Sequence, residues 1–98
     1  MKIHLKKFGT MLISRQSGRE AFAALQPQLH ALGTDEDLEL DFDGVTTFAP
    51  SWGDEFLSPL HKKYSAKLVL RGTENPSVRA TIELLEEIYP NSPFRISP

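Results

Sequence analysis

The sequence predicts an α/β fold, in one domain, with a mainly parallel sheet. Short segments with an apolar residue at every second position alternate with longer segments whose apolar residues recur every three or four positions. A steady strand–helix alternation of this kind implies parallel strands joined by right-handed crossovers. The length of 98 residues suits a single core, and no long linker or low-complexity tract divides it.

Three segments have the two-residue period of a strand with one face in the core: residues 2–6, 38–43 and 67–71. A short fourth strand is predicted within the tail 91–98, around Phe94 and Ile96, because the prolines that flank it are tolerated at a sheet edge. The sheet is therefore expected to contain about four strands.

The polar faces of these strands differ in charge. A sheet covered on both faces would have almost continuously apolar strands, so the alternation predicts helices mainly on one face. Segment 38–43 is acidic on its polar side, and the segments before and after it are basic; the residues concerned are Lys2, His4, Lys6, Glu39, Asp41, Asp43, Lys67 and Arg71. Opposite charges on neighbouring strands contribute about 0.2 to 1 kcal/mol per pair. This pattern favours strands in sequential order, and it explains the two aspartates without a metal site.

Two helices are predicted between the strands. Residues 14–32 have an apolar face and lead to Gly33, which suits a left-handed helix end; the face consists of Phe22, Leu25, Leu29 and Leu32. Residues 51–64 form the second helix. Pro59 is expected to kink or split it, and Pro27 the first helix, because each proline removes an internal amide donor.

A third helix follows the third strand. Asn75 is the expected cap and Pro76 the first-turn residue, and Pro90 is expected to stop the helix. One apolar stripe runs between them, made of Val78, Ile82, Leu85 and Tyr89.

The composition narrows the range of functions. A net charge of −2 gives no general attraction to nucleic acid. There are no cysteines for disulfides or zinc, and the three histidines, His4, His30 and His61, lack metal-ligand spacing. No apolar run is long enough for a signal peptide or a membrane span. We expect a soluble, cytoplasmic protein without cofactor, metal, nucleic-acid or membrane partners.

The stretch "FAPSWGDEF", residues 48–56, places Ser51 between a strand and a helix. Ser51 could be a helix cap, a phosphate acceptor or a nucleophile. With Asp54 it resembles a capping box, and Asp54 and Glu55 would lie in the first turn, where the helix dipole favours anions. A nucleophilic serine needs a histidine base, and the only later histidine, His61, lies about 15 Å further along the same helix.

The longer stretch "LELDFDGVTTFAPSWGDEF" resembles the core motif of the STAS-like family, relatives of the bacterial anti-sigma factor antagonists. Asp43 and Gly44 match its aspartate-glycine turn, and Ser51 is followed by an aromatic, a small residue and Asp-Glu. The early stretch "FGTMLISR" also resembles this family, with Ser14 and Arg15 opening the first helix. The resemblance covers about residues 1–90 and implies the same order of strands.

The resemblance implies a non-catalytic regulatory module that binds another protein, such as an anti-sigma factor or a histidine-kinase-like ATPase that phosphorylates the serine. The contact residues would be Ser51, Trp52, Asp54 and Glu55. Pro50 stands where antagonists of this kind carry an aspartate. Trp52 has a second interpretation as a core anchor, since a first-turn tryptophan more often packs inward.

Two other classes of function stay open. The start of the second helix could bind a small anion or a nucleotide, although no glycine-rich loop or nearby lysine accompanies it. Alternatively, the chain could be an accessory subunit whose sheet edge pairs with another protein. The lysine-rich segment 2–6 argues against pairing at that edge.

Overall fold

The computed structural model describes residues 1–88 and 93–97. It confirms the α/β fold. A four-stranded sheet has the order β1-β3-β5-β6, and all neighbouring strands are parallel; the strands are β1 (Lys2–His4), β3 (Leu38–Asp41), β5 (Leu68–Arg71) and β6 (Arg95–Ile96). The sequential order and the short edge strand in the tail are therefore as predicted.

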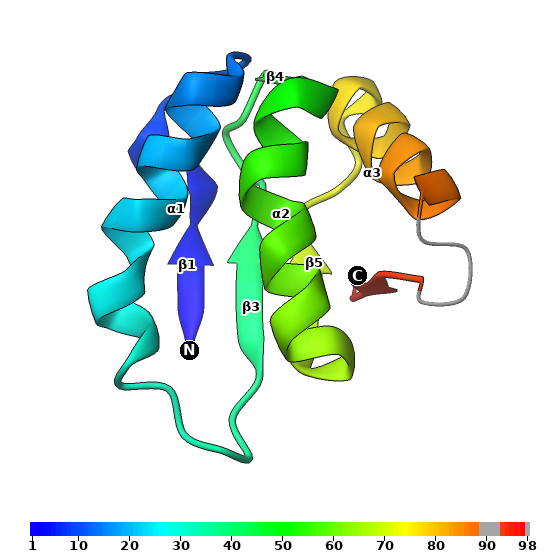
Figure 1. Cartoon of the computed structure of the whole chain (residues 1–98). Coiled ribbons are helices and arrows are strands. Elements are labelled where there is room, and N and C mark those ends of the chain that lie inside the picture. The colour runs from blue at the N-terminus through cyan, green and yellow to red at the C-terminus, as the bar shows by residue number, and fades with distance from the viewer. Residues whose placement is uncertain (89–92, 98) are drawn as a thin grey trace.

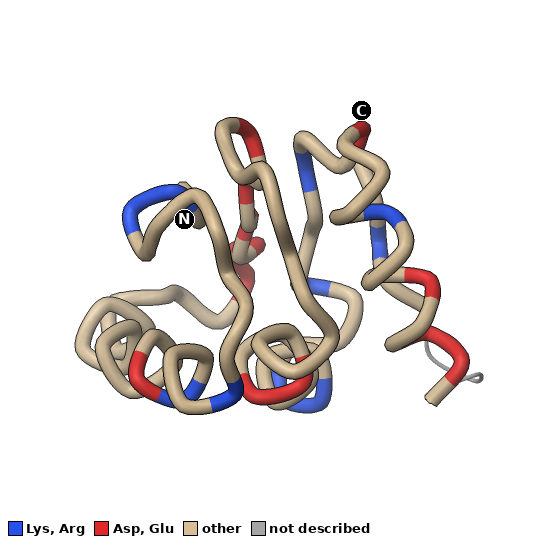
Figure 2. Tube along the Cα trace, turned by 90° about the horizontal axis from the view of Figure 1, so that it is seen from above, with Lys and Arg blue, Asp and Glu red and all other residues tan. Residues whose placement is uncertain are grey.

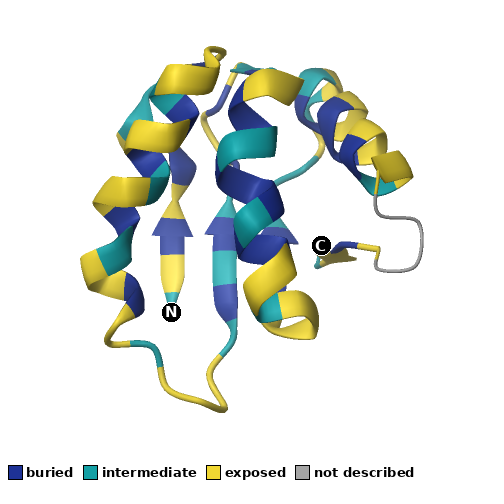
Figure 3. Cartoon of the chain, in the orientation of Figure 1, coloured by how far each residue is buried: buried dark blue, intermediate teal, exposed yellow. Residues whose placement is uncertain are grey.

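Three helices pack against this sheet: α1 (Arg15–Leu29) and α2 (Pro50–Tyr64) lie side by side over one face, and α3 (Pro76–Ile88) lies next to α2 toward the edge of the sheet (Figure 1). All three begin at the same end of the molecule, because each follows the carboxyl end of a parallel strand. Their inward faces and the apolar face of the sheet form the core, visible as the dark blue sides of the helices in Figure 3.

The charged side chains of neighbouring strands lie opposite partners of the other sign, as the sequence predicts. Asp41 lies opposite both His4 of β1 and Arg71 of β5, and Glu39 lies opposite Lys2. The Asp41 carboxylate is 3.6 Å from the Lys2 ammonium and 3.6 Å from His4 Nδ1, and Arg71 donates to Glu39. Seen from above, the acidic strand runs between basic segments (Figure 2).

Three charged residues assigned to this ladder lie outside the strands. Lys6 belongs to a 3₁₀ helix, η1 (Leu5–Phe8), and Lys67 to a second one, η2 (Ser65–Lys67). Asp43 lies in the turn after β3. The predicted strands were too long because a buried residue in a 3₁₀ turn, such as Leu5, fits the two-residue period as well as a residue in a strand.

Two further strands were not predicted. β2 (Met11–Leu12) and β4 (Thr47–Phe48) form a separate parallel pair. Each has only two residues, which is too short for alternation to be recognised. Their pairing brings the chain before α1 next to the chain before α2, and the Ala49 amide donates to the Leu12 carbonyl at 2.8 Å.

The helix ends confirm one prediction and correct another. Asn75 caps α3, accepting from the Ser77 amide at 2.7 Å. Gly33 is not a left-handed cap: α1 ends at Leu29, and the Gly33 amide donates to the Glu36 carboxylate at 3.0 Å. Neither internal proline splits its helix, because burial of one whole face outweighs the roughly 3 kcal/mol cost of a proline. Two residues of the third-helix prediction, Tyr89 and Pro90, lie outside the described residues.

Candidate functional site

The start of α2 differs from the predicted capping box. Ala49 is the N-cap residue and Pro50 the first helical residue, and no side chain caps this end. Proline suits this position because its fixed backbone angle matches the helix and its missing N–H is not needed there. Ser51 is thus the second helical residue, with an exposed side chain, and its prediction as the cap is wrong.

Asp54 and Glu55 lie beyond the first turn, and their partners are arginines of α1. Arg15 Nη1 donates to Asp54 Oδ2 at 2.9 Å and to Glu55 Oε1 at 3.0 Å. Arg19 Nη1 reaches the same Glu55 oxygen at 3.3 Å. The hydrogen bonds to Asp54 and then Glu55 raise the pKa of Arg15 above its ordinary value. Two positive and two negative charges therefore neutralise each other beside Ser51.

Close backbone packing holds the first turns of α1 and α2 together. Gly18 of α1 lies against the Trp52 main chain, so that a Cβ at this position would come within 2.6 Å of the Trp52 carbonyl oxygen. On the other side of α2, a Cβ at Gly53 would meet Leu85 of α3 and Phe48, both at 3.0 Å. Two glycines thus fix α2 between its neighbours.

Trp52 is a core residue, which agrees with the second interpretation and not with a contact role. Its side chain is 0% exposed. The indole ring packs against Phe56, Phe48 and Phe8, with ring centroids 4.7, 5.9 and 6.2 Å away. Among the described residues, the buried Nε1 has no hydrogen-bond partner. Trp52 therefore cannot offer its side chain to a partner protein.

The other residues of the predicted motif fall into two places. Ser14 caps α1, because its Oγ accepts from the Ser17 amide at 3.0 Å, and Arg15 follows it into the ion-pair cluster. Asp43 and Gly44 form a turn at the end of β3, where Gly44 has φ of 88°. The Asp43 amide donates to Asp41 at 3.0 Å, so that this turn supports the sheet.

Two exposed apolar residues beside Ser51 were missed in the sequence. Met11 is 62% exposed and Ile13 is 45% exposed, on either side of the buried Leu12. Because Ala49 is hydrogen-bonded to Leu12, Ile13 lies alongside the start of α2. The only sequence signal was the run "MLI" next to a serine cap. We call the exposed surface of Met11, Ile13, Arg15, Ser51, Asp54 and Glu55 the Ser51 corner.

The described residues contain no group of three or more His, Asp or Glu side chains placed to hold a metal ion. The His61 ring is buried, with its centroid 4.3 Å from that of Phe94, on the part of α2 far from Ser51. None of the helices described is long and apolar enough to cross a membrane.

Comparison of the chain with protein-family models, with curated proteins and with solved structures finds no match in any of the three.

Proposed function

We propose that this chain is a non-catalytic regulatory module that binds another protein, in the cytoplasm, through the Ser51 corner. The observation that carries the proposal is the exposure of Met11 and Ile13, 62% and 45%, on the segment that pairs with the chain just before α2. Apolar side chains rimmed by charged residues are typical of protein-binding surfaces.

The rigidity of this corner supports the proposal. Arg15 joins α1 to two carboxylates of α2, and Gly18 allows the helices to touch. A surface that is already ordered loses little conformational freedom on binding, which favours affinity.

Ser51 is the proposed switch. Its hydroxyl is exposed, and α2 has no side-chain cap, so that a phosphate on Ser51 would meet the free amides at the start of the helix. The repulsion expected from Asp54 and Glu55 is offset by Arg15 and Arg19. A partner docked on the corner would have to desolvate nearly two added negative charges. Phosphorylation by a histidine-kinase-like ATPase would thus release an anti-sigma factor or a similar partner.

The apolar contact is tested with proteins that co-purify with the tagged wild-type chain. We expect Ile13→Ser to weaken retention of the partner by about tenfold or more, because an apolar contact of about 1.4 kcal/mol is lost. Leu84→Ser is the matched control, since Leu84 of α3 is 43% exposed and lies outside the corner. Equal retention by both variants would show that the corner is not the contact.

The switch is tested with Ser51→Asp. We expect this variant to fold normally and to lose the partner, whereas Ala80→Asp, which adds the same charge at an exposed position of α3, should retain it. If Ser51→Asp retains the partner as well as the wild type does, the switch is excluded, whereas the contact itself is judged by Ile13→Ser.

A small-anion or nucleotide site is the second candidate, favoured by the absence of a side-chain cap on α2. Calorimetry with nucleoside triphosphates distinguishes it. Micromolar binding that Ser51→Asp abolishes would support this candidate, and the absence of heat would exclude it.

A further inference from the structure

A surface pocket lies at the opposite end of α1 and α2 from the Ser51 corner. Its volume is about 320 Å³, and residues of both helix ends and of the adjoining loops line it, among them Leu29, Leu32, Thr34, Lys63, Tyr64 and Lys67. At about 30 Å³ for each water-sized atom, it has room for roughly ten non-hydrogen atoms. This volume matches a small organic molecule and is too large for a single inorganic ion.

The apolar wall of the pocket is part of the molecule's core. Leu29 is 6% exposed, and Leu32 and Tyr64 are partly buried against the core cluster. Because these side chains are held by packing, the wall exists before any ligand arrives. A flat aromatic or branched aliphatic group would bury its surface here.

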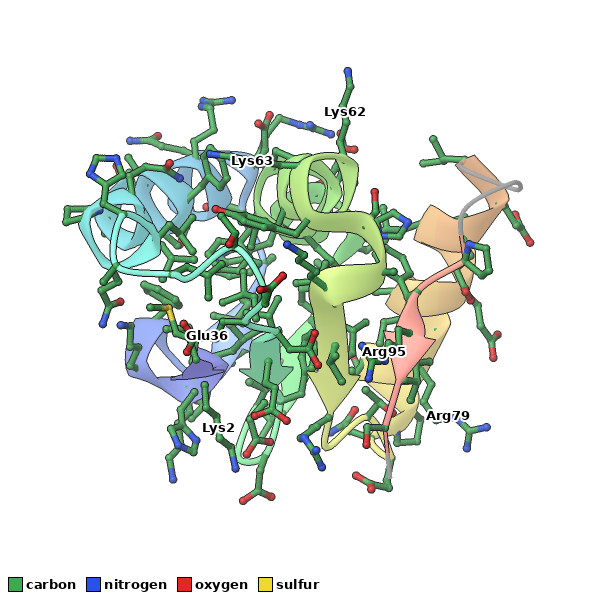
Figure 4. All side chains as sticks on the ribbon, turned by 90° about the horizontal axis from the view of Figure 1, so that it is seen from below. Lys2, Glu36, Lys62, Lys63, Arg79 and Arg95 are labelled. Atoms are coloured by element: carbon green, nitrogen blue, oxygen red, sulfur yellow. The ribbon has the colours of Figure 1, made fainter. Side chains whose placement is uncertain are left out.

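The polar part of the pocket is positively charged. Lys63 and Lys67 line it, and none of the described residues that line it is acidic. Within residues 1–88 and 93–97, no carboxylate lies within ion-pair distance of either ammonium, although Lys63 lies 5.5 Å from the centre of the Tyr64 ring. Figure 4 shows Lys63 on the side of α2 toward α1, whereas Lys62 points away from the molecule.

Four of the five arginines, Arg15, Arg19, Arg71 and Arg95, have carboxylate partners. Among the described residues, Lys63 and Lys67 have none, and neither does Arg79. The position of Lys63 near the end of α2 explains in part why a positive charge is present there without a carboxylate partner, because a cation is favoured at a helix C-terminus. It does not explain Lys67, which lies in η2 after the helix has ended. The two charges are available to an anion.

We propose that this pocket binds a small organic anion whose carboxylate pairs with Lys63 and Lys67 and whose compact apolar body lies on Leu29, Leu32 and Tyr64. Another pocket, of about 290 Å³, lies between α3 and β6, and its charged lining residues are Glu74, Glu83, Glu86 and Arg79. Three carboxylates against one guanidinium leave this pocket with a net negative charge, which disfavours the same ligand. The proposed site is separate from the Ser51 corner and does not depend on the function proposed for it.

The test is a titration of the ¹⁵N-labelled chain with sodium phenylacetate at constant ionic strength, followed by amide chemical shifts. We expect saturable shifts confined to residues 29–34 and 63–67. Acetate, which lacks the apolar body, and phenylacetamide, which lacks the charge, should both fail to saturate. Failure of phenylacetate to saturate, shifts centred on other residues, or saturation by acetate or phenylacetamide would overturn the proposal.

Substitutions give the second arm of the test. Lys63→Gln and Lys67→Gln should each weaken phenylacetate binding by about tenfold, as expected for loss of one charged hydrogen bond. Lys62→Gln is the matched control, because it removes the same charge from the adjacent, exposed position. If Lys62→Gln weakens phenylacetate binding as much as the pocket variants do, only the net charge of the protein matters and the proposed site is wrong. The proposal is also overturned if neither Lys63→Gln nor Lys67→Gln weakens binding. All three positions are exposed, so the dispersion of the amide spectrum checks that each variant is folded.

Discussion

Gly18 and Trp52 meet where α1 crosses α2, with space for a hydrogen atom but not for a methyl group at position 18. An added Cβ would lie 2.6 Å from the Trp52 carbonyl oxygen and 3.1 Å from its Cα. Both neighbours are main-chain atoms, so neither can rotate away as a flexible side chain could. The distance between the two helices is therefore set by this glycine.

Gly18→Ala should destabilise the protein although alanine favours helices. The propensity gain is about 1 kcal/mol, and forcing a methyl group into a packed contact costs about 1 to 3 kcal/mol. We expect a lower free energy of unfolding in urea. Gly33→Ala is the control, since a Cβ there meets only Glu36 side-chain atoms at 3.7 Å and should change stability by less than about 0.5 kcal/mol. A variant at position 18 that is more stable than wild type would refute the close contact.

The three serine and asparagine residues at helix starts should differ on replacement by alanine. Ser14 and Asn75 accept hydrogen bonds from helix amides, so Ser14→Ala and Asn75→Ala should each cost about 1 kcal/mol. Ser51→Ala should leave the free energy of unfolding within about 0.5 kcal/mol of wild type, because Ser51 caps nothing. A loss at position 51 equal to that at position 14 would restore the capping role.

Asp41 should make stability depend on pH. The hydrogen bond from the Asp43 amide, with further contributions from Lys2 and His4, lowers the pKa of Asp41 below its ordinary 3.8. As pH falls, the Asp41 carboxylate is therefore protonated at a higher pH in the unfolded chain than in the folded chain. The ionised Asp41 contributes its full stabilisation of the fold above pH 3.8, and this contribution is lost as pH falls through the pKa of Asp41 in the folded chain. Urea unfolding should show Asp41→Asn less stable than wild type at pH 7, with the difference shrinking below about pH 4. A difference independent of pH would exclude this linkage.

Trp52 should be essential for folding and inaccessible from the surface of the folded protein. Trp52→Ala removes a side chain that is 0% exposed and should cost about 3 to 5 kcal/mol, whereas Trp52→Phe should cost less because Phe retains part of the packing with Phe56. The chain has one tryptophan, so its fluorescence reports this site alone. Emission should shift to longer wavelength on unfolding in urea, and an acrylamide quencher should have little access before unfolding. Strong quenching of the folded protein would contradict burial.

The start of α3 could be predicted, and the same rule would also have given the start of α2. Asn75 before Pro76 identified a cap and a first-turn residue, as the structure confirms. Ala49 before Pro50 has the same arrangement, because a residue preceding proline avoids the helical region and the proline fits the first turn. The prediction instead placed the helix start at Ser51, because serine is a common N-cap residue.

The contacts between elements could not be predicted in the same way. Whether Trp52 packs inward depends on where α2 begins and on the closeness of α1, which Gly18 permits. Asp54 and Glu55 were assigned to the helix dipole, yet their partners are arginines that lie far away in sequence. Local propensity contains no information on such distant pairs.

The sequential strand order also has a consequence for synthesis of the chain on a ribosome. Each strand of the main sheet pairs with the strand before it in that sheet, from β1 through β3 and β5 to β6. A nascent chain can therefore extend its sheet in the order in which its strands emerge, without waiting for a later segment to insert between earlier ones. Until β6 pairs, the β5 edge stays open, and it carries Leu68, Val69 and Leu70. Unpaired edges of this kind are where chains pair with one another, so release of the protein before β6 has formed should promote aggregation through β5.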